Sequence, residues 1–114
     1  MTKQRICIVG DGLSGLMTAV SLAKVPGIEV NLIAKKGTKN ADKRTTAISD
    51  SNFKFVIQNI TTLGQKLFWP SKKIELFYET SKEKINFLNL HEANSNLMYV
   101  FENDKVKSLL LIEI

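Results

Sequence analysis

The amino-acid sequence predicts an α/β protein that begins with a strand–helix–strand unit and continues into an antiparallel β-hairpin. The first observation is an apolar, β-branched run at residues 5–9, which stops at a glycine-rich turn and is followed by apolar positions at helical spacing. The second is a pair of alternating runs, at residues 74–78 and 85–90, that flank a polar turn. With 114 residues, 44% hydrophobic and 24% charged, the chain has the size and composition of one globular domain.

The strand–helix–strand unit is predicted over residues 5–33. Residues 5–9 are apolar on both faces, as in a buried parallel strand, and Cys7 in this run is expected in the core. A helix is expected from Gly12 to the Pro26–Gly27 pair, because apolar side chains recur at helical spacing: Leu13, Leu16, Met17, Val20 and Ala23. Residues 28–33 predict the second strand, so the three elements form a βαβ unit with a right-handed crossover.

A polar loop and a second helix follow this unit. Residues 35–43 are polar and contain a glycine, which is typical of a loop. Apolar side chains within residues 52–63 lie on one side of a predicted helix, and Asp50 or Ser51 is the expected N-terminal cap.

The last third of the chain predicts the hairpin, a short strand at residues 97–101 and a final helix. Asn103 or Asp104 is expected to cap that helix. No strand follows it to use the crossover that it begins, so the predicted fold is an incomplete α/β domain.

The glycine-rich turn carries the strongest functional signal. Gly10, Gly12 and Gly15 give the pattern G-x-G-x-x-G between the first strand and the first helix. In a Rossmann-like fold the first glycine permits the tight turn, the second lets a pyrophosphate approach the backbone, and the third lets helix and strand pack closely. The helix N-terminus, with Leu13 and Ser14 in its first turn, then offers N–H groups to the phosphates. The alternative is a tight turn without a ligand.

The position after the second strand departs from that pattern. An acidic residue normally stands there and accepts hydrogen bonds from the adenosine ribose, whereas this chain has Ala34 followed by Lys35 and Lys36. The two lysines could bind the 2′-phosphate of NADP, or they could be surface charges beside a site that has decayed. The sequence leaves both interpretations open.

A second block, Asp42-Lys43-Arg44-Thr45-Thr46-Ala47-Ile48-Ser49, precedes segments at residues 73–76 and 97–103. This order resembles the N-terminal third of the FAD-dependent aromatic-ring hydroxylases of ubiquinone biosynthesis, in the same broad group as p-hydroxybenzoate hydroxylase. The resemblance covers nearly the whole chain. It implies that residues 1–114 are a partial FAD-binding domain of a longer enzyme.

The resemblance also implies roles for particular residues. The glycine turn would bind the ADP part of FAD, and Arg44 would lie near the flavin and its pyrophosphate, where a guanidinium can fork onto phosphate oxygens. The alternative for Arg44 is a loop arginine in solvent. Family members use NAD(P)H and O2 to hydroxylate a polyprenylated phenol, and the cofactor supplies that chemistry. Later family motifs are missing, so we expect weak FAD retention and no activity from this chain alone.

Other site chemistry is not predicted. His91 is the only histidine, no metal-ligating cluster accompanies it, and no carboxylate pair suits acid–base catalysis, so neither a catalytic residue nor a metal site is assigned. The net charge of +5 is due mostly to lysines; Arg5 and Arg44 are the only arginines, which argues against nucleic-acid recognition.

Partners and location follow from the same features. One cysteine and no membrane-spanning run predict a cytoplasmic protein, and the resemblance allows peripheral association with the inner membrane. The partners implied are a small aromatic substrate of the complete enzyme and a second chain that supplies its missing part. Two alternatives stay open, a small NADP-binding module and a non-catalytic piece that completes the sheet of another chain.

Overall fold

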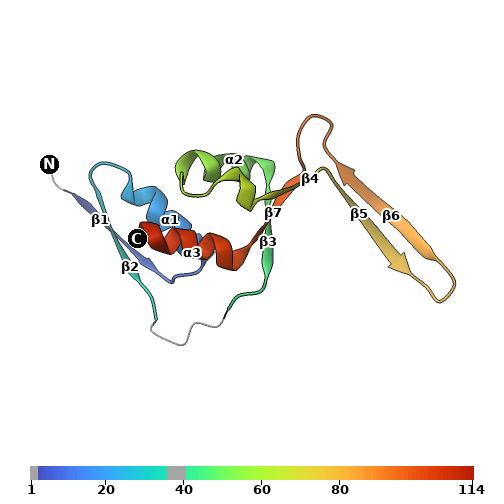
Figure 1. The fold of residues 1–114 in the computed structure, drawn as a ribbon, viewed down its shortest axis with the longest axis horizontal. Coiled ribbons are helices and arrows are strands. Elements are labelled where there is room, and N and C mark those ends of the chain that lie inside the picture. Colours follow the sequence, from blue (N-terminus) through green and yellow to red (C-terminus); the bar gives the residue numbers. More distant parts are fainter. Residues whose placement is uncertain (1–2, 36–40) are drawn as a thin grey trace.

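The computed structural model describes residues 3–35 and 41–114, and it is a mixed α/β structure (Figure 1). Its elements in chain order are β1 (Gln4–Val9), α1 (Leu13–Ala23), β2 (Ile28–Ile33), β3 (Thr45–Ser49), α2 (Asp50–Asn59), the 3-10 helix η1 (Gln65–Leu67), β4 (Trp69–Ser71), β5 (Lys73–Glu79), β6 (Lys84–His91), β7 (Met98–Glu102) and α3 (Asn103–Glu113). The strands form a parallel pair β1–β2, an antiparallel sheet in the order β3–β7–β4, and the hairpin β5–β6. Within residues 3–35 and 41–114, none of the helices combines the length and the apolar composition of a membrane-spanning segment.

The predicted βαβ unit is confirmed. β1 and β2 pair in parallel, from Gln4 opposite Ile28 to Val9 opposite Ile33, with α1 between them in the chain. Gly27 has φ of +81°, a conformation that favours glycine, and it completes the turn that leads into β2.

The expectation that β1 is buried on both faces is wrong. Ile6 and Ile8 are half-buried, but Cys7 is exposed and Val9 is 80% exposed. α1 contacts both strands of the pair, and the alternating burial along each strand shows that one face is covered. Nothing in the described chain covers the other face, which carries Cys7. An apolar strand can be buried on both faces, but whether it is buried depends on which other elements pack against each face.

The second helix begins earlier and ends earlier than predicted. Ser49 has an extended backbone at the end of β3, and its hydroxyl accepts a hydrogen bond from the backbone N–H of Asn52 at 3.2 Å. Ser49 is therefore the cap in place of Asp50 or Ser51. The helix ends at Asn59, and the apolar Ile60 and Leu63 are buried in the irregular segment that follows. Their spacing extended the predicted helix beyond its real end.

The strand at the end of the chain is confirmed at Met98–Glu102, but the predicted caps of the final helix are wrong. Glu102 is the N-cap residue of α3 and makes no side-chain capping bond, so Asn103 and Asp104 lie inside the helix. Their side chains are already engaged by the loop before β3: the amide of Asn103 and the carboxylate of Asp104 each bind Asp42.

The hydrophobic core lies where the three helices meet the sheet β3–β7–β4. Phe53 of α2 stacks on Tyr99 of β7 at 3.7 Å between ring centroids, and Phe68 packs edge-on against Phe53 and Phe101. The buried cluster comprises Leu16, Val20, Phe53, Val56, Ile60, Leu63, Phe68, Phe101, Val106 and Leu110. This core fixes α3 beside α1 and thereby positions the site described below.

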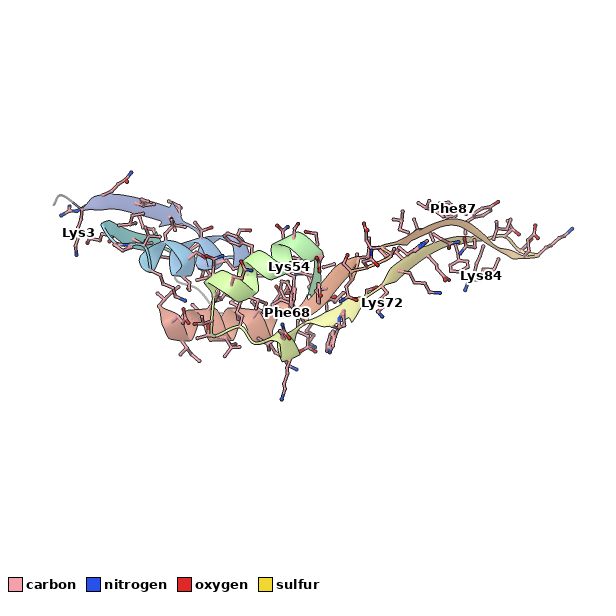
Figure 2. The ribbon with its side chains drawn as sticks, turned by 90° about the horizontal axis from the view of Figure 1, so that it is seen from above. Lys3, Lys54, Phe68, Lys72, Lys84 and Phe87 are labelled. Carbon is pink, nitrogen blue, oxygen red and sulfur yellow. The ribbon has the colours of Figure 1, made fainter. Side chains whose placement is uncertain are left out.

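The predicted hairpin is confirmed, and it projects from the rest of the molecule (Figures 1 and 2). The overall extents of 66 × 38 × 22 Å reflect this projection. The hairpin turn is closed by a hydrogen bond from the N–H of Thr80 to the carbonyl oxygen of Glu83 at 2.8 Å. The register shifts between Leu76 and Phe77, where β6 contains one extra residue.

Candidate functional site

The turn between β1 and α1 requires glycine at two of its three glycine positions. Gly10 has φ of +109°, and its N–H donates to the carbonyl oxygen of Ile33 at 2.8 Å, which ties the turn to the end of β2. A side chain at Gly15 would collide with the carbonyl oxygen of Gly10. Gly10 and Gly15 are therefore required by the fold itself.

Gly12 differs from the other two glycines. Its φ of −70° and ψ of 177° suit any residue, and, apart from Gly12 and its two neighbours in the chain, no described residue has an atom within 4 Å of the place that a Cβ would take. It caps α1 through its backbone, and no side chain in the described ranges bonds to that helix end. The open side of Gly12 leaves room for a group outside the chain to approach the first turn, where Leu13 and Ser14 lie.

A second helix N-terminus faces the same place. Gly12, Leu13 and Ser14 line a pocket of about 270 Å³ together with residues of the loop before β3 and of α3; those residues are Asp42, Arg44, Asn103 and Lys107. The opposite ends of the two helices also lie together, since Lys24, at the C-terminal end of α1, forms an ion pair of 3.7 Å with Glu113 of α3. α1 and α3 are thus packed side by side in the same direction (Figure 1). Their partial positive charges add at the pocket.

Arg44 lines this pocket, and its guanidinium is held by a carboxylate. Its Nε donates to Oδ1 of Asp42 at 2.8 Å and its Nη2 donates to Oδ2 at 2.9 Å. This fork, the backbone N–H of Arg44 and the amide of Asn103 lower the pKa of Asp42 well below its usual value, and the same pairing raises the pKa of Arg44. The side chain of Arg44 is 81% exposed, and three of its five N–H donors remain outside the fork.

Asn103 fixes the loop that carries this ion pair. It is the buried polar residue of the described chain, and its side chain accepts from the hydroxyl of Thr46 at 2.5 Å and donates to Oδ2 of Asp42 at 3.2 Å. Its backbone N–H donates to the carbonyl oxygen of Arg44 at 3.1 Å. Asp42 in turn donates its backbone N–H to Oδ1 of Asp104 at 3.0 Å. Three of these hydrogen bonds anchor the loop to the first turn of α3, and the fourth, from Thr46, anchors β3 to the same turn.

Lys107 completes the pocket and was not predicted from the sequence. It lies one helical turn after Asn103, so its side chain lies on the same face of α3. It is half-buried, and no carboxylate of the described chain pairs with it. No local sequence signal could have found it, because the packing of α3 beside α1 brings Lys107 to the glycine turn. The formal charges that line the pocket are two positive, from Arg44 and Lys107, and one negative, from Asp42.

The remaining residues singled out by the sequence lie elsewhere. Ala34 and Lys35 are exposed just after β2 and do not line the pocket, and Lys36 is outside the described residues. His91 is exposed at the end of β6. Over residues 3–35 and 41–114, no group of three His, Cys, Asp or Glu side chains could hold a metal ion.

Comparison with known proteins gives no assignment: no family model matches the sequence, and no curated protein matches it. The functional argument therefore depends on the residues of the glycine-turn pocket.

Proposed function

We propose that this chain binds the diphosphate of FAD in the glycine-turn pocket and is the cofactor-binding part of an FAD-dependent aromatic-ring hydroxylase. The observation that carries the proposal is the convergence of the open glycine turn, two parallel helix N-termini, Arg44 and Lys107 on one pocket. Such an arrangement is suited to an anion with several oxygens.

The residues present fit a diphosphate. The N–H groups in the first turn of α1 have no side-chain partner in the described structure, and Gly12 leaves room beside them. Lys107 supplies a mobile point charge, and Arg44 has donors left beyond its fork with Asp42. When bound, FAD would supply the redox chemistry of hydroxylation. This chain contributes the grip on the phosphates, and we assign none of its residues to catalysis.

The uncovered sheet faces support the interpretation as one part of a larger assembly. Val9 and Ile33, the paired residues at the ends of β1 and β2, are 80% and 55% exposed. In α/β proteins helices cover both faces of a parallel sheet. A second chain or further domain that covers this face would also support the flavin ring and bind the aromatic substrate, so we expect the isolated chain to hold FAD weakly.

The test is the affinity of the purified chain for FAD, ADP and riboflavin, measured by flavin fluorescence and by calorimetry. We expect FAD and ADP to bind and riboflavin, which has no phosphate, not to bind. Lys107→Gln should weaken FAD binding roughly 10- to 100-fold, because a hydrogen bond to a charged group contributes about 1.5–3 kcal/mol. Lys105→Gln is the matched control, since Lys105 is on the same helix but is exposed and paired with Glu102 at 2.9 Å. Equal losses in the two variants, or riboflavin binding as tight as FAD binding, would contradict the proposal.

An NADP-binding module is the second candidate, because Lys35 is exposed directly after β2 where a 2′-phosphate would lie. It predicts that NADP binds more tightly than NAD and that Lys35→Gln removes the difference. Equal affinities for NAD and NADP in the unchanged protein would exclude it.

A further inference from the structure

The projecting hairpin has one continuous apolar face. Residues directly opposite each other in an antiparallel pair point to the same side. The pairs Ile74–Leu90, Leu76–Leu88 and Tyr78–Ile85 alternate with the pairs Glu75–Asn89 and Phe77–Asn86 and therefore share one face. The extra residue of β6, Phe87, joins this face, because its ring lies 5.9 Å from that of Tyr78. We call these seven side chains the apolar hairpin face.

The side chains on the opposite face of the hairpin interact with one another. Lys73 pairs with Glu75 at 2.8 Å, Asn86 donates to Asn89 at 2.8 Å, and the ammonium of Lys84 lies 4.7 Å from the ring centre of Phe77. Figure 2 shows Lys84 and Phe87 on opposite sides of the hairpin. The hairpin is thus amphipathic: the side chains on the opposite face are polar except for Phe77, which is 43% exposed beneath Lys84, whereas all seven on the apolar hairpin face are apolar or aromatic.

The apolar hairpin face is uncovered. Leu76, Tyr78, Phe87, Leu88 and Leu90 are between 39% and 57% exposed, and no other strand of the described chain pairs with either outer edge of the hairpin. Together these side chains expose roughly 400–500 Å² of surface, which is the size of the largest apolar patch on a typical monomer, and such patches are often functional. A two-stranded hairpin is marginally stable in water unless its apolar face packs against another element.

We infer that the apolar hairpin face packs against the same face of a second copy of this chain. Two such faces would bury roughly 800–1,000 Å² in total, which is below the size of standard specific interfaces and in the range of weak, transient ones. The inference is independent of the proposed function.

Charge favours a second copy over a charged partner. Residues 73–91 contain three lysines and three glutamates, so the hairpin is neutral although the whole chain carries +5. Two neutral hairpins therefore meet without the charge repulsion that the positively charged remainders of two chains would experience. The hairpin also has no net charge to attract a strongly charged partner. Because the hairpin projects away from the helices (Figure 1), two chains can meet through their hairpins while their positively charged remainders stay apart. The modest area predicts a dissociation constant on the order of 10 μM.

The test is sedimentation equilibrium of the whole chain from about 1 to about 200 μM, a range that brackets this constant. We expect a monomer–dimer equilibrium in the unchanged protein. Leu88→Lys should abolish it by placing a charge in the apolar hairpin face, and Asn89→Lys, the neighbouring residue on the polar face, should leave it intact. Circular dichroism checks that both variants are folded.

A cross-linking experiment keeps the inference testable if Leu88→Lys fails to fold. In a Cys7→Ser background, Leu88→Cys should give a disulfide-linked dimer on mild oxidation, whereas Asn89→Cys should not. Three results would overturn the inference: a monomer over the whole range, a dimer that Leu88→Lys leaves unchanged, or a monomer that instead sediments with neutral phosphatidylcholine vesicles.

Discussion

The same substitution at two glycines of the turn should have opposite effects on stability. At Gly15 a new Cβ would collide with the carbonyl oxygen of Gly10, a backbone atom that cannot move without disturbing its own turn. Overpacking of this kind costs about 1–3 kcal/mol. For a domain of this size, 1 kcal/mol corresponds to roughly 4–8 °C in Tm, so Gly15→Ser should lower Tm by roughly 5–20 °C.

At Gly12 the same serine meets open space, and the extended backbone of that residue is the one in which serine caps a helix. Gly12→Ser should therefore leave Tm unchanged or raise it slightly. Its side chain would occupy the room that the proposed diphosphate needs, so ADP affinity should fall while stability does not.

Thermal unfolding followed by far-UV circular dichroism, together with ADP titration, separates the two effects. The reasoning would be refuted if Gly12→Ser lowered Tm as much as Gly15→Ser, because a side chain at position 12 would then collide with its surroundings. Full ADP affinity in Gly12→Ser would instead refute the assignment of that space to the ligand.

Three further predictions concern the loop and the core. Asp42→Asn should destabilise the chain at neutral pH, and the difference from the unchanged protein in urea unfolding should shrink as pH falls below about 4, because the lowered pKa of Asp42 gives stability that is present above its unfolded pKa and lost on acidification; a difference that is independent of pH would contradict this. Asn103→Ala should cost about 1–3 kcal/mol in the same measurement by removing a buried hydrogen-bond partner, whereas Asn86→Ala on the exposed hairpin should cost less than 0.5 kcal/mol. Leu110→Ala should lower the free energy of unfolding by about 2–5 kcal/mol, and Ile112→Ala should lower it far less, because Ile112 is 77% exposed. Similar losses in the two variants would show that Leu110 is not part of the core.

Local periodicity was enough to predict the elements that lie close together in the chain. The βαβ unit and the hairpin follow from spacings of two and of three to four residues, and both are present in the structure. β3 was overlooked although Thr45–Ser49 contains β-branched residues, because its pairing partner β7 lies about 50 residues later in the chain. The exposure of Cys7 was missed for a related reason: burial of a strand face depends on elements that its own sequence does not describe.

The candidate site shows the same division. The glycine pattern predicted the turn, and the clash that a Cβ at Gly15 would make with the carbonyl oxygen of Gly10 shows the close packing expected of that glycine. The ligand-binding role of Gly12 stays a prediction. Lys107 could not be assigned to the turn, because only the tertiary packing of α3 beside α1 brings it there. Arg44 and Asp42 are separated by only one position, so their ion pair is local in the sequence. It was not predicted, because side-chain geometry in a loop follows no periodic pattern.

The core and the pocket are therefore coupled through the direction of α3. Leu16 and Val20 of α1 belong to the same buried cluster as Val106 and Leu110 of α3, and this cluster holds the two helices parallel. The positive ends of the helices add at the pocket only while that packing persists, because the field of a helix end falls off within its last turn. It follows that Leu110→Ala, on the turn of α3 after Lys107, should weaken ADP binding even when the affinity is corrected for the folded fraction. Ile112→Ala should not, since its side chain takes no part in this packing.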